Sequence, residues 1–339
     1  MKNTNISICD VVIQPGESAN LALPLPDFYS CTSFYIPIKL KHGKLKGPCL
    51  LIFAGVRGNE LNGIQIINDL LQRPELSTLR GTLITLPVLN IFGLMNGTGF
   101  MPYEKNLEDC FPGDIHGSYG ERIAELFTNQ ILKKATHCLE LKTGALNQDL
   151  LPQIYCDLDV LEAKNLARKF AAPVINHVST SDNSISQTAE ALDIPYLTFK
   201  AGEALRFEES AIRTGVEGIL NMLHSLDMID RKTEANQKVF KPIFSQEQEW
   251  IRSHRSGVLV TEVILGQLVK KDQIIGRITD PFSANTVEPV KSYQDGVIVG
   301  INRNPLVYEG QCIFKIATFV DNNRAELTLE AWNELQVAE

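Results

Sequence analysis

The chain contains 339 residues and carries a formal net charge of −8, a size that can bury the core of one large domain and a smaller one. The acidic balance disfavours a non-specific nucleic-acid binder, which needs positive charge to meet the phosphate backbone. The sequence has no run of about 18 apolar residues and does not begin with the charged-then-apolar pattern of a signal peptide. We therefore expect a cytoplasmic protein without nucleic-acid or membrane partners.

Residues 1–40 alternate short apolar stretches with Pro and Gly, which predicts strands packed on the main domain. Over residues 41–230, apolar strand patterns alternate with amphipathic helix patterns, which predicts an α/β sheet covered by helices on both faces. The expected strands are 49–56, 81–90, 137–143, 173–178 and 195–202. The expected helices are 61–73, 120–135, 160–171, 188–194 and 210–226.

After about residue 230 the sequence becomes polar and then turns to short strands separated by turn residues. Residues 231–339 are predicted to form a small all-β domain, a barrel or sandwich with biotinyl-like hairpins, that ends in a short helix. Lys270 and Lys271 lie in one such hairpin without the usual modification sequence around them, so we interpret them as solvated lysines. Seven scattered cysteines without a C-x-x-C pair are interpreted as reduced, mostly buried thiols.

Four short motifs follow one another along the chain. They are LLIFAGVRGNELNG at 50–63, LPVLNIFGLMNGTGFMPYEKNLEDCFPGD at 86–114, LELKTG at 139–144 and LTFKAG at 197–202. In this order they resemble motifs of the succinylglutamate desuccinylase/aspartoacylase family, zinc amidohydrolases related to the zinc carboxypeptidases. The resemblance covers residues 30 to 318 and implies a zinc-carboxypeptidase-like mixed sheet of about eight strands flanked by helices.

The resemblance also implies roles by position, and most of the chemical residues differ from those of the family. The two histidine ligands of zinc correspond to Arg57 and Lys142, whereas the carboxylate ligand is retained as Glu60. The general-base glutamate corresponds to Lys200, which makes this lysine the candidate catalytic residue. The substrate-binding positions correspond to Gly99, Glu108 and Asp109.

These replacements disfavour the zinc mechanism. A guanidinium and an ammonium offer no lone pair, so Arg57 and Lys142 cannot serve as ligands. An ammonium at Lys200 accepts a proton only if burial beside other cations depresses its pKa strongly. We therefore predict no metal and no other cofactor, with zinc as the cofactor only if unrecognised ligands assist Glu60.

The replaced residues can also compensate one another. If the fold is kept, three cations and three carboxylates converge on one cleft and are expected to form an ion-pair network, because an unpaired buried charge costs several kcal/mol. The cations are Arg57, Lys142 and Lys200, and the carboxylates are Glu60, Glu108 and Asp109.

Simpler roles stay open for individual residues. Glu60 can be a carboxylate at a helix N-terminus, where the helix dipole favours it, and Lys200 can be a paired structural lysine. His137 and Glu140 are three residues apart on a strand, so they point to opposite faces and cannot share a metal. His116 is the one histidine expected close to the cleft.

The leading interpretation is a family member that has lost zinc-dependent amide hydrolysis and binds a small ligand or a protein partner in the former active-site cleft, with a homo-oligomer possible. One alternative is an active hydrolase, a deacylase of N-acyl amino acids or related linear amides, which uses a metal on Glu60 or a metal-free reaction at Lys200. A second alternative is a structural subunit paired with an active paralogue.

Overall fold

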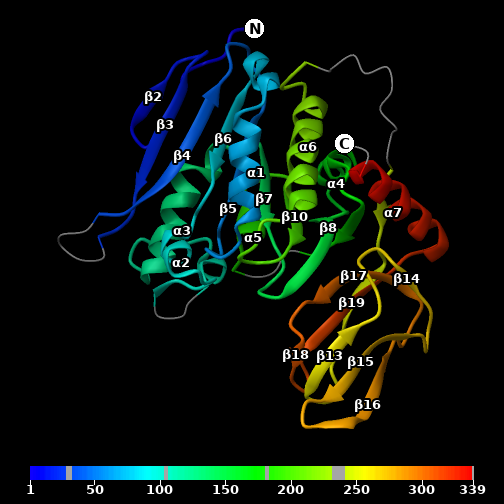
Figure 1. The fold of residues 1–339 in the computed structure, drawn as a ribbon. Helices are drawn as coiled ribbons and strands as arrows, with labels where there is room; N and C mark the ends of the chain where they lie inside the picture. Colours follow the sequence, from blue (N-terminus) through cyan, green and yellow to red (C-terminus); the bar gives the residue numbers. More distant parts are fainter. Residues whose placement is uncertain (28–32, 103–105, 180–182, 231–240, 338–339) are drawn as a thin grey trace.

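The structure is a computed structural model that describes residues 1–27, 33–102, 106–179, 183–230 and 241–337. Its main element is a large mixed sheet (Figure 1). In chain order its thirteen strands are β3 (Ser18–Pro24), β4 (Tyr35–His42), β5 (Cys49–Ala54), β6 (Thr82–Leu86), β7 (His137–Lys142), β8 (Gln148–Cys156), β9 (Val174–His177), β10 (Tyr196–Gly202), β11 (Ile243–Phe244), β12 (Glu247–Arg252), β14 (Leu268–Val269), β17 (Gly296–Asn302) and β19 (Cys312–Thr318). The spatial order along the main path is β12-β19-β17-β8-β10-β7-β5-β6-β4-β3.

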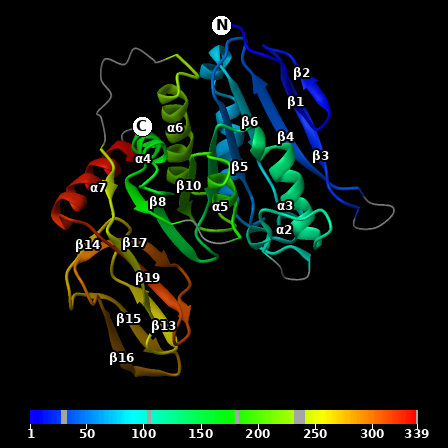
Figure 2. The same ribbon diagram turned by 180° about the vertical axis from the view of Figure 1, so that it is seen from behind.

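Helices cover both faces of this sheet, as Figures 1 and 2 show from opposite sides. The first face carries α1 (Asn62–Leu71), α4 (Leu161–Phe170) and α6 (Glu209–Ser225). The second face carries α2 (Ile91–Asn96), α3 (Tyr119–Gln130) and α5 (Ile185–Glu190). The central strand β5 sends Leu50 and Ile52 to the first core and Leu51 and Phe53 to the second. Because neighbouring strand residues point to opposite faces, a strand buried on both sides is apolar throughout.

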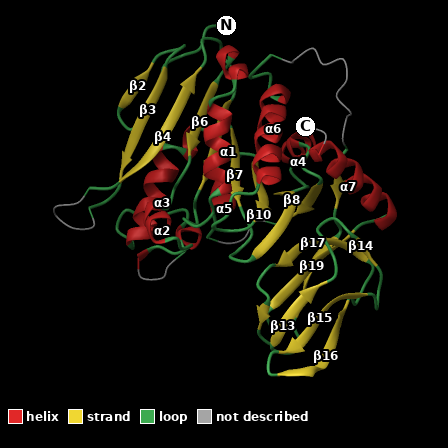
Figure 3. Cartoon of the chain, in the orientation of Figure 1, coloured by secondary structure: helices red, strands yellow, loops and turns green. Residues whose placement is uncertain are grey.

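The C-terminal part of the chain consists mainly of strands, with one long helix beside them (Figure 3). A second sheet has the strand order β16-β15-β13-β18, formed by β16 (Ser283–Lys291), β15 (Ile274–Asp280), β13 (Gly257–Thr261) and β18 (Leu306–Val307). Its core includes Ile278 and Val290 and is shared with Ile298 of β17 and Phe314 of β19. The helix α7 (Asn322–Val337) packs through Ala325, Leu329 and Trp332, and the hairpin of β1 (Ile6–Ile8) and β2 (Val11–Ile13) lies near the N-terminus.

The predicted fold class is confirmed, and the eight strands β3 to β10 account for the sheet that the resemblance implies. The sequence patterns missed β8 and the short helix α2, and α7 spans 16 residues where a short helix was expected. Strands also cross the expected domain limits. β4 spans residue 40, and β17 pairs with β8 through Gly300 and Leu150, so the main sheet continues into the C-terminal strands. The polar segment 231–249 was expected to be a linker or an edge segment. Its residues 231–240 lie outside the described residues, and its remainder contributes to the strands β11 and β12.

Two expectations from the sequence concern membrane-spanning segments and the state of the thiols. Across the described ranges, no helix is both long enough and apolar enough to span a bilayer. Six cysteines are free thiols, four of them buried, and Cys31 lies outside the described residues.

Candidate functional site

The candidate site lies where parallel strands end at one edge of the main sheet. β5 is parallel to β7, and β7 is parallel to β10, with Lys142 directly beside Lys200 in the ladder. The turn that follows β5 carries Arg57 and Glu60. Since parallel strands end on the same side of a sheet, the topology brings together three of the four sequence motifs.

Close packing of glycine fixes the turn after β5. A Cβ atom at Gly58 would lie 1.9 Å from the backbone nitrogen of Leu94 in α2, so no larger residue fits there. Gly55 adopts a φ of 61°, a left-handed conformation that glycine tolerates best. Gly58 thus holds the turn against α2, and Gly55 lets the chain turn beside Val88, which together fix the backbone that carries Arg57 and Glu60.

Five side chains form the charged cluster, which we define as Arg57, Glu60, Glu108, Glu140 and Lys142. Nη2 of Arg57 donates to Oε2 of Glu108 at 3.3 Å, and Nζ of Lys142 donates to Oε1 of the same carboxylate. Lys142 also lies 3.3 Å from Oε1 of Glu140. Glu108 comes from the 3-10 helix Leu107–Cys110, so a loop element closes the cluster over the sheet edge.

The third carboxylate of the charged cluster is Glu140, whereas the sequence predicted Asp109. Asp109 is exposed, accepts a hydrogen bond from Asn106, and has no ion pair with the three cations among the described residues. Glu140 takes its place because residues 140 and 142 lie on the same face of β7. Tyr196 Oη and Thr198 Oγ1 donate to Oε2 of Glu140 at 2.7 and 3.3 Å and hold its carboxylate.

The cluster shifts the titration of its members. Burial raises the pKa of Glu60 to about 7, although Lys142 and Arg57 partly offset this effect. Burial disfavours the Lys142 ammonium, yet Glu140, Glu108 and Glu60 outweigh burial and raise its pKa above the ordinary value. Burial likewise opposes ionisation of Glu108, but Lys142 and Arg57 hold its pKa below the ordinary range. Lys142 is therefore a fixed cation that three carboxylates surround.

Lys200 lies beside this cluster but has a different environment. It forms no ion pair with a carboxylate within the part of the chain that the structure describes, and its Nζ lies 4.9 Å from the ring centroid of Tyr155. Burial and the neighbouring Lys142 lower the pKa of Lys200, and the carboxylates of the cluster only partly counteract them. Among the described residues, the contact of Lys200 is therefore with an aromatic ring and not with a carboxylate.

A cavity of about 580 Å³ opens beside the charged cluster. Its floor includes Lys142, Tyr155, Thr198 and Lys200, and Glu108 lies at its wall. Cavities of this size hold small organic ligands. Four of the seven site residues assigned from the sequence line this cavity, namely Glu108, Asp109, Lys142 and Lys200, whereas Arg57, Glu60 and Gly99 are not among its lining residues.

The residues present do not fit the zinc ion that the family resemblance implies. Zinc requires imidazole, thiolate or carboxylate donors, commonly three from the protein in hydrolases. Arg57 and Lys142 offer no lone pair, and they already engage Glu108 and Glu140. A dication beside Glu60 would have to displace a paired ammonium, so these residues do not provide the donor set of the standard zinc site.

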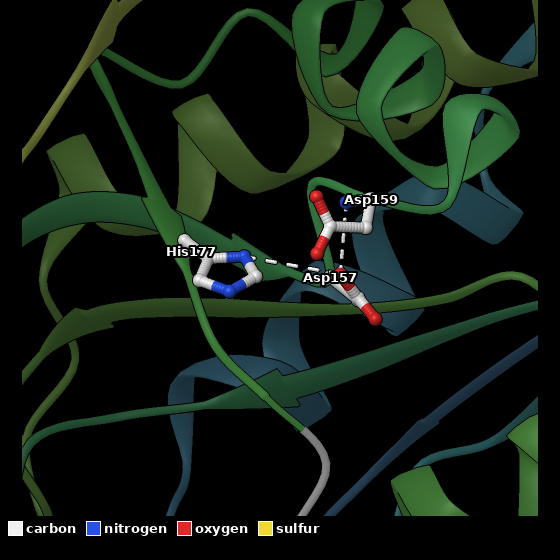
Figure 4. Close-up of side chains that lie close together, drawn as sticks. All are labelled: Asp157, Asp159 and His177. Atoms are coloured by element: carbon white, nitrogen blue, oxygen red, sulfur yellow. Dashed lines mark hydrogen bonds and ion pairs between the residues drawn. The ribbon is translucent and has the colours of Figure 1, made fainter.

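A second group with metal-ligand chemistry is drawn in Figure 4, and one of its members, Asp157, also lines the cavity. Asp157, Asp159 and His177 place one ligand atom each within 4.8 Å of one another. Sequence reasoning missed this group because its members come from two separate segments. However, Nδ1 of His177 accepts a hydrogen bond from the backbone of Leu158, and Asp157 caps the amide of Asp159. These bonds give the three residues a structural role in a turn.

The remaining sequence predictions can be placed individually. Gly99 lies against Arg57, whose Cδ would be 3.4 Å from an added Cβ atom. His137 Nε2 lies 2.8 Å from Glu162, away from Glu140, so the prediction that these two residues cannot share a metal is confirmed. Glu60 directly precedes the N-cap residue Leu61 of α1, and no side-chain hydrogen bond caps this helix, so a role of Glu60 at the helix terminus stays a prediction that rests on the helix dipole. His116 is exposed and does not line the cavity.

Solved structures with the same architecture define the class of protein. A succinylglutamate desuccinylase/aspartoacylase from Rhodobacter sphaeroides matches with a TM-score of 0.80 and 22% identity, covering 92% of this chain and 98% of the other. The product-bound ectoine utilization protein EutE (DoeB) from Ruegeria pomeroyi matches with a TM-score of 0.79 and 19% identity, covering 94% and 100%. At these identities the matches establish a deacylase-type fold.

Sequence comparison then identifies the family. Residues 46–226 match the profile of the succinylglutamate desuccinylase/aspartoacylase catalytic domain, which is more than half of the chain. The chain therefore belongs to the succinylglutamate desuccinylase/aspartoacylase family. It is also 26% identical over 301 residues to the N-alpha-acetyl-L-2,4-diaminobutyric acid deacetylase of Halomonas elongata, which covers 85% of this chain and 86% of that relative.

Proposed function

We propose that the cavity binds a small acylated amino acid or a related linear amide, and that it does so without zinc-dependent hydrolysis. The observation that carries this proposal is the position of the Lys142 ammonium, which is paired with Glu108 and Glu140 beside the retained Glu60. A fixed positive charge occupies the place where hydrolysis would need a metal-bound water. The size of the cavity supports a small ligand over a protein partner.

A second candidate function is an active deacylase of N-acyl amino acids. The name of the Halomonas elongata relative favours this candidate, and taken alone the comparisons support it better than loss of activity. The chemistry would then use groups other than the standard zinc site. Lys200 is the candidate general base, since burial and the charge of Lys142 lower its pKa and thereby favour the neutral amine that a base requires.

Binding and turnover can be separated with one set of compounds. We expect N-acetyl-L-2,4-diaminobutyrate and other N-acetyl amino acids to raise the melting temperature with saturation, because a ligand of the folded state stabilises it by mass action. We expect no free amine to be released during prolonged incubation, with or without added zinc. Steady amine release that scales with protein concentration would contradict the proposal and establish the deacylase.

A variant that fills the cavity controls for binding elsewhere. Ser186 lines the cavity on α5, and Ser186→Trp should abolish the thermal shift. Ser77 is exposed on the short 3-10 helix Pro74–Thr78 and is not among the residues that line the cavity. Ser77→Trp should therefore leave the shift of the melting temperature unchanged. Two further proposals concern the cellular location and the oligomeric state of the protein. We infer a cytoplasmic location from the free thiols of the described cysteines, and gel filtration would test for a homo-oligomer or for a paralogous partner.

A further inference from the structure

A second group of positive charges lies next to the charged cluster, at the junction between the α/β part and the C-terminal strands. Lys200 is on β10, Tyr155 is on β8 and Lys315 is on β19, strands that lie close together in the main sheet (Figure 1). Nζ of Lys200 lies 4.9 Å and Nζ of Lys315 lies 5.7 Å from the centroid of the Tyr155 ring. Two lysines from distant parts of the sequence thus share one aromatic ring.

Neither lysine has an acidic partner. Lys142 forms ion pairs with two carboxylates, but Lys200 and Lys315 form none with the residues that the structure describes. Within the described part of the chain, Lys315 has one polar contact, a donation to Tyr155 Oη at 3.3 Å. Partly buried ammonium groups without a counter-charge are costly, so their presence beside a cavity needs an explanation.

Tyr155 cannot supply the missing negative charge. Burial raises its pKa above the ordinary value, so the phenol stays neutral. Its hydroxyl lies 3.2 Å from Oε1 of Gln153 and 3.0 Å from Oε1 of Gln248, and these amides bond with Asn176 in turn. The ring is therefore held by a neutral network, and it keeps the two lysines in place without neutralising them.

The two cations are electrostatically linked. Burial, together with the smaller effect of the Lys200 charge, lowers the pKa of Lys315 to about 8. Burial and the charge of Lys142 lower the pKa of Lys200. An anion beside Lys200 would relieve both the desolvation and the repulsion, which makes anion binding favourable at this point.

We propose that Lys200 and Lys315 form an anion subsite of the cavity, in which Lys200 contacts a carboxylate or similar oxyanion of the ligand and Lys315 adds positive potential from behind the Tyr155 ring. Lys200 lines the cavity, whereas Lys315 does not, which assigns the direct contact to Lys200. The inference deepens the proposed function, because it rests on the same cavity and names the anionic end of the ligand. The charged cluster, whose charges largely balance, then faces the remainder of the molecule.

The affinity for anions should depend on pH in one direction. An ammonium attracts an anion and a neutral amine does not. The affinity should therefore be highest at a pH below the pKa values of the two lysines in the ligand-free protein, and it should fall as pH rises through about 8, the pKa of Lys315. Glu60, Glu108 and Glu140 also face Lys200, and ionisation of Glu60 near pH 7 weakens anion binding in the same direction. If the affinity of Lys315→Met for anions no longer falls as pH rises through about 8, this part of the pH dependence is due to Lys315.

The subsite can be tested on the full chain with acetate, malonate and sulfate as probes in isothermal titration calorimetry at low ionic strength. We expect malonate to bind the unaltered chain and Lys200→Met to lose more than about 30-fold in affinity, as expected for one buried charge-assisted contact. Lys315→Met should lose about 3- to 10-fold, the range for a screened charge at a distance. The exposed Lys270, paired with Asp295, provides the matched control, and Lys270→Met should bind like the unaltered chain.

The variants also report on folding. Lys200→Met removes an unpaired buried charge, so its melting temperature should rise or stay constant, and a loss of binding in such a folded variant supports the subsite. Equal anion affinity in Lys200→Met and the unaltered chain, or no anion binding by the unaltered chain, would overturn the inference. If acylated amino acids bind but do so independently of Lys200, the subsite fails and the proposed function stands. If malonate binds through Lys200 and no acylated amino acid binds, the subsite stands and the proposed function fails.

Discussion

Replacing Lys142 by methionine should lower the free energy of unfolding by about 3–5 kcal/mol, the range observed when one partner of a buried ion pair is removed. The substitution preserves the length of the side chain but leaves Glu108 and Glu140 without the ammonium that joins them. The side chains of Lys142 and Glu140 are 13% and 6% exposed, so water cannot replace the lost partner. Urea denaturation at pH 8 would measure the effect.

Two companion variants distinguish the buried pair from a general loss of charge. Lys142→Met combined with Glu140→Gln should recover part of the lost stability, since it removes one of the uncompensated charges. Lys270→Met breaks an exposed pair with Asp295 and should change stability by less than about 1 kcal/mol. A Lys142→Met variant as stable as the Lys270→Met control would mean that the charged cluster does not stabilise the fold.

Glu60 should make the protein less stable as pH rises from about 5 to about 8. Its folded pKa of about 7 lies above the ordinary value of 4.5, so between these values the folded chain holds a proton that the unfolded chain has released. Stability from this residue is complete below the unfolded pKa and is lost as pH rises through the folded pKa. Glu60→Gln removes the titration, so at pH 8 it should be more stable than the unaltered chain by about 2–3 kcal/mol, with little difference at pH 5.

The difference between the two proteins isolates Glu60 from all other titrating groups. Urea denaturation of both at pH 5 and pH 8 provides the four free energies of unfolding that are required. Glu247 is an exposed carboxylate on β12, and Glu247→Gln should show no such change with pH. An advantage of Glu60→Gln over the unaltered chain that does not grow between pH 5 and pH 8 would show that Glu60 is ionised and well solvated in the fold.

The fold was accessible from the sequence because its central strands are buried on both faces. Leu50 to Phe53 point alternately into two cores, so the run is apolar throughout and easily recognised as a strand. β8 escaped prediction because its inner face is polar. Gln153 and Tyr155 belong to the amide and phenol network beneath the cavity, which interrupts the apolar pattern.

The sequence predicted where the candidate site lies, but it predicted only some of the contacts between the residues of the site. The four motifs placed Arg57, Glu108 and Lys142 on one cleft, and the structure joins them by ion pairs. Glu140 was considered only as the partner of His137 three residues away, although its spacing of two from Lys142 placed both on one strand face. The contribution of Lys315 could not be foreseen, since it depends on the pairing of β17 with β8 and β19, far apart in the sequence.

Zinc analysis of the purified full chain is the measurement that tests the account most directly. Because the Lys142 ammonium occupies the carboxylates beside Glu60, we predict that the protein retains no stoichiometric zinc after exchange into metal-free buffer, and that Glu60→Ala leaves the metal content unchanged. Zinc that is lost on His177→Ala would belong to the turn at the cavity rim. About one tightly bound zinc per chain that disappears in Glu60→Ala would contradict the account and indicate a metal-dependent hydrolase.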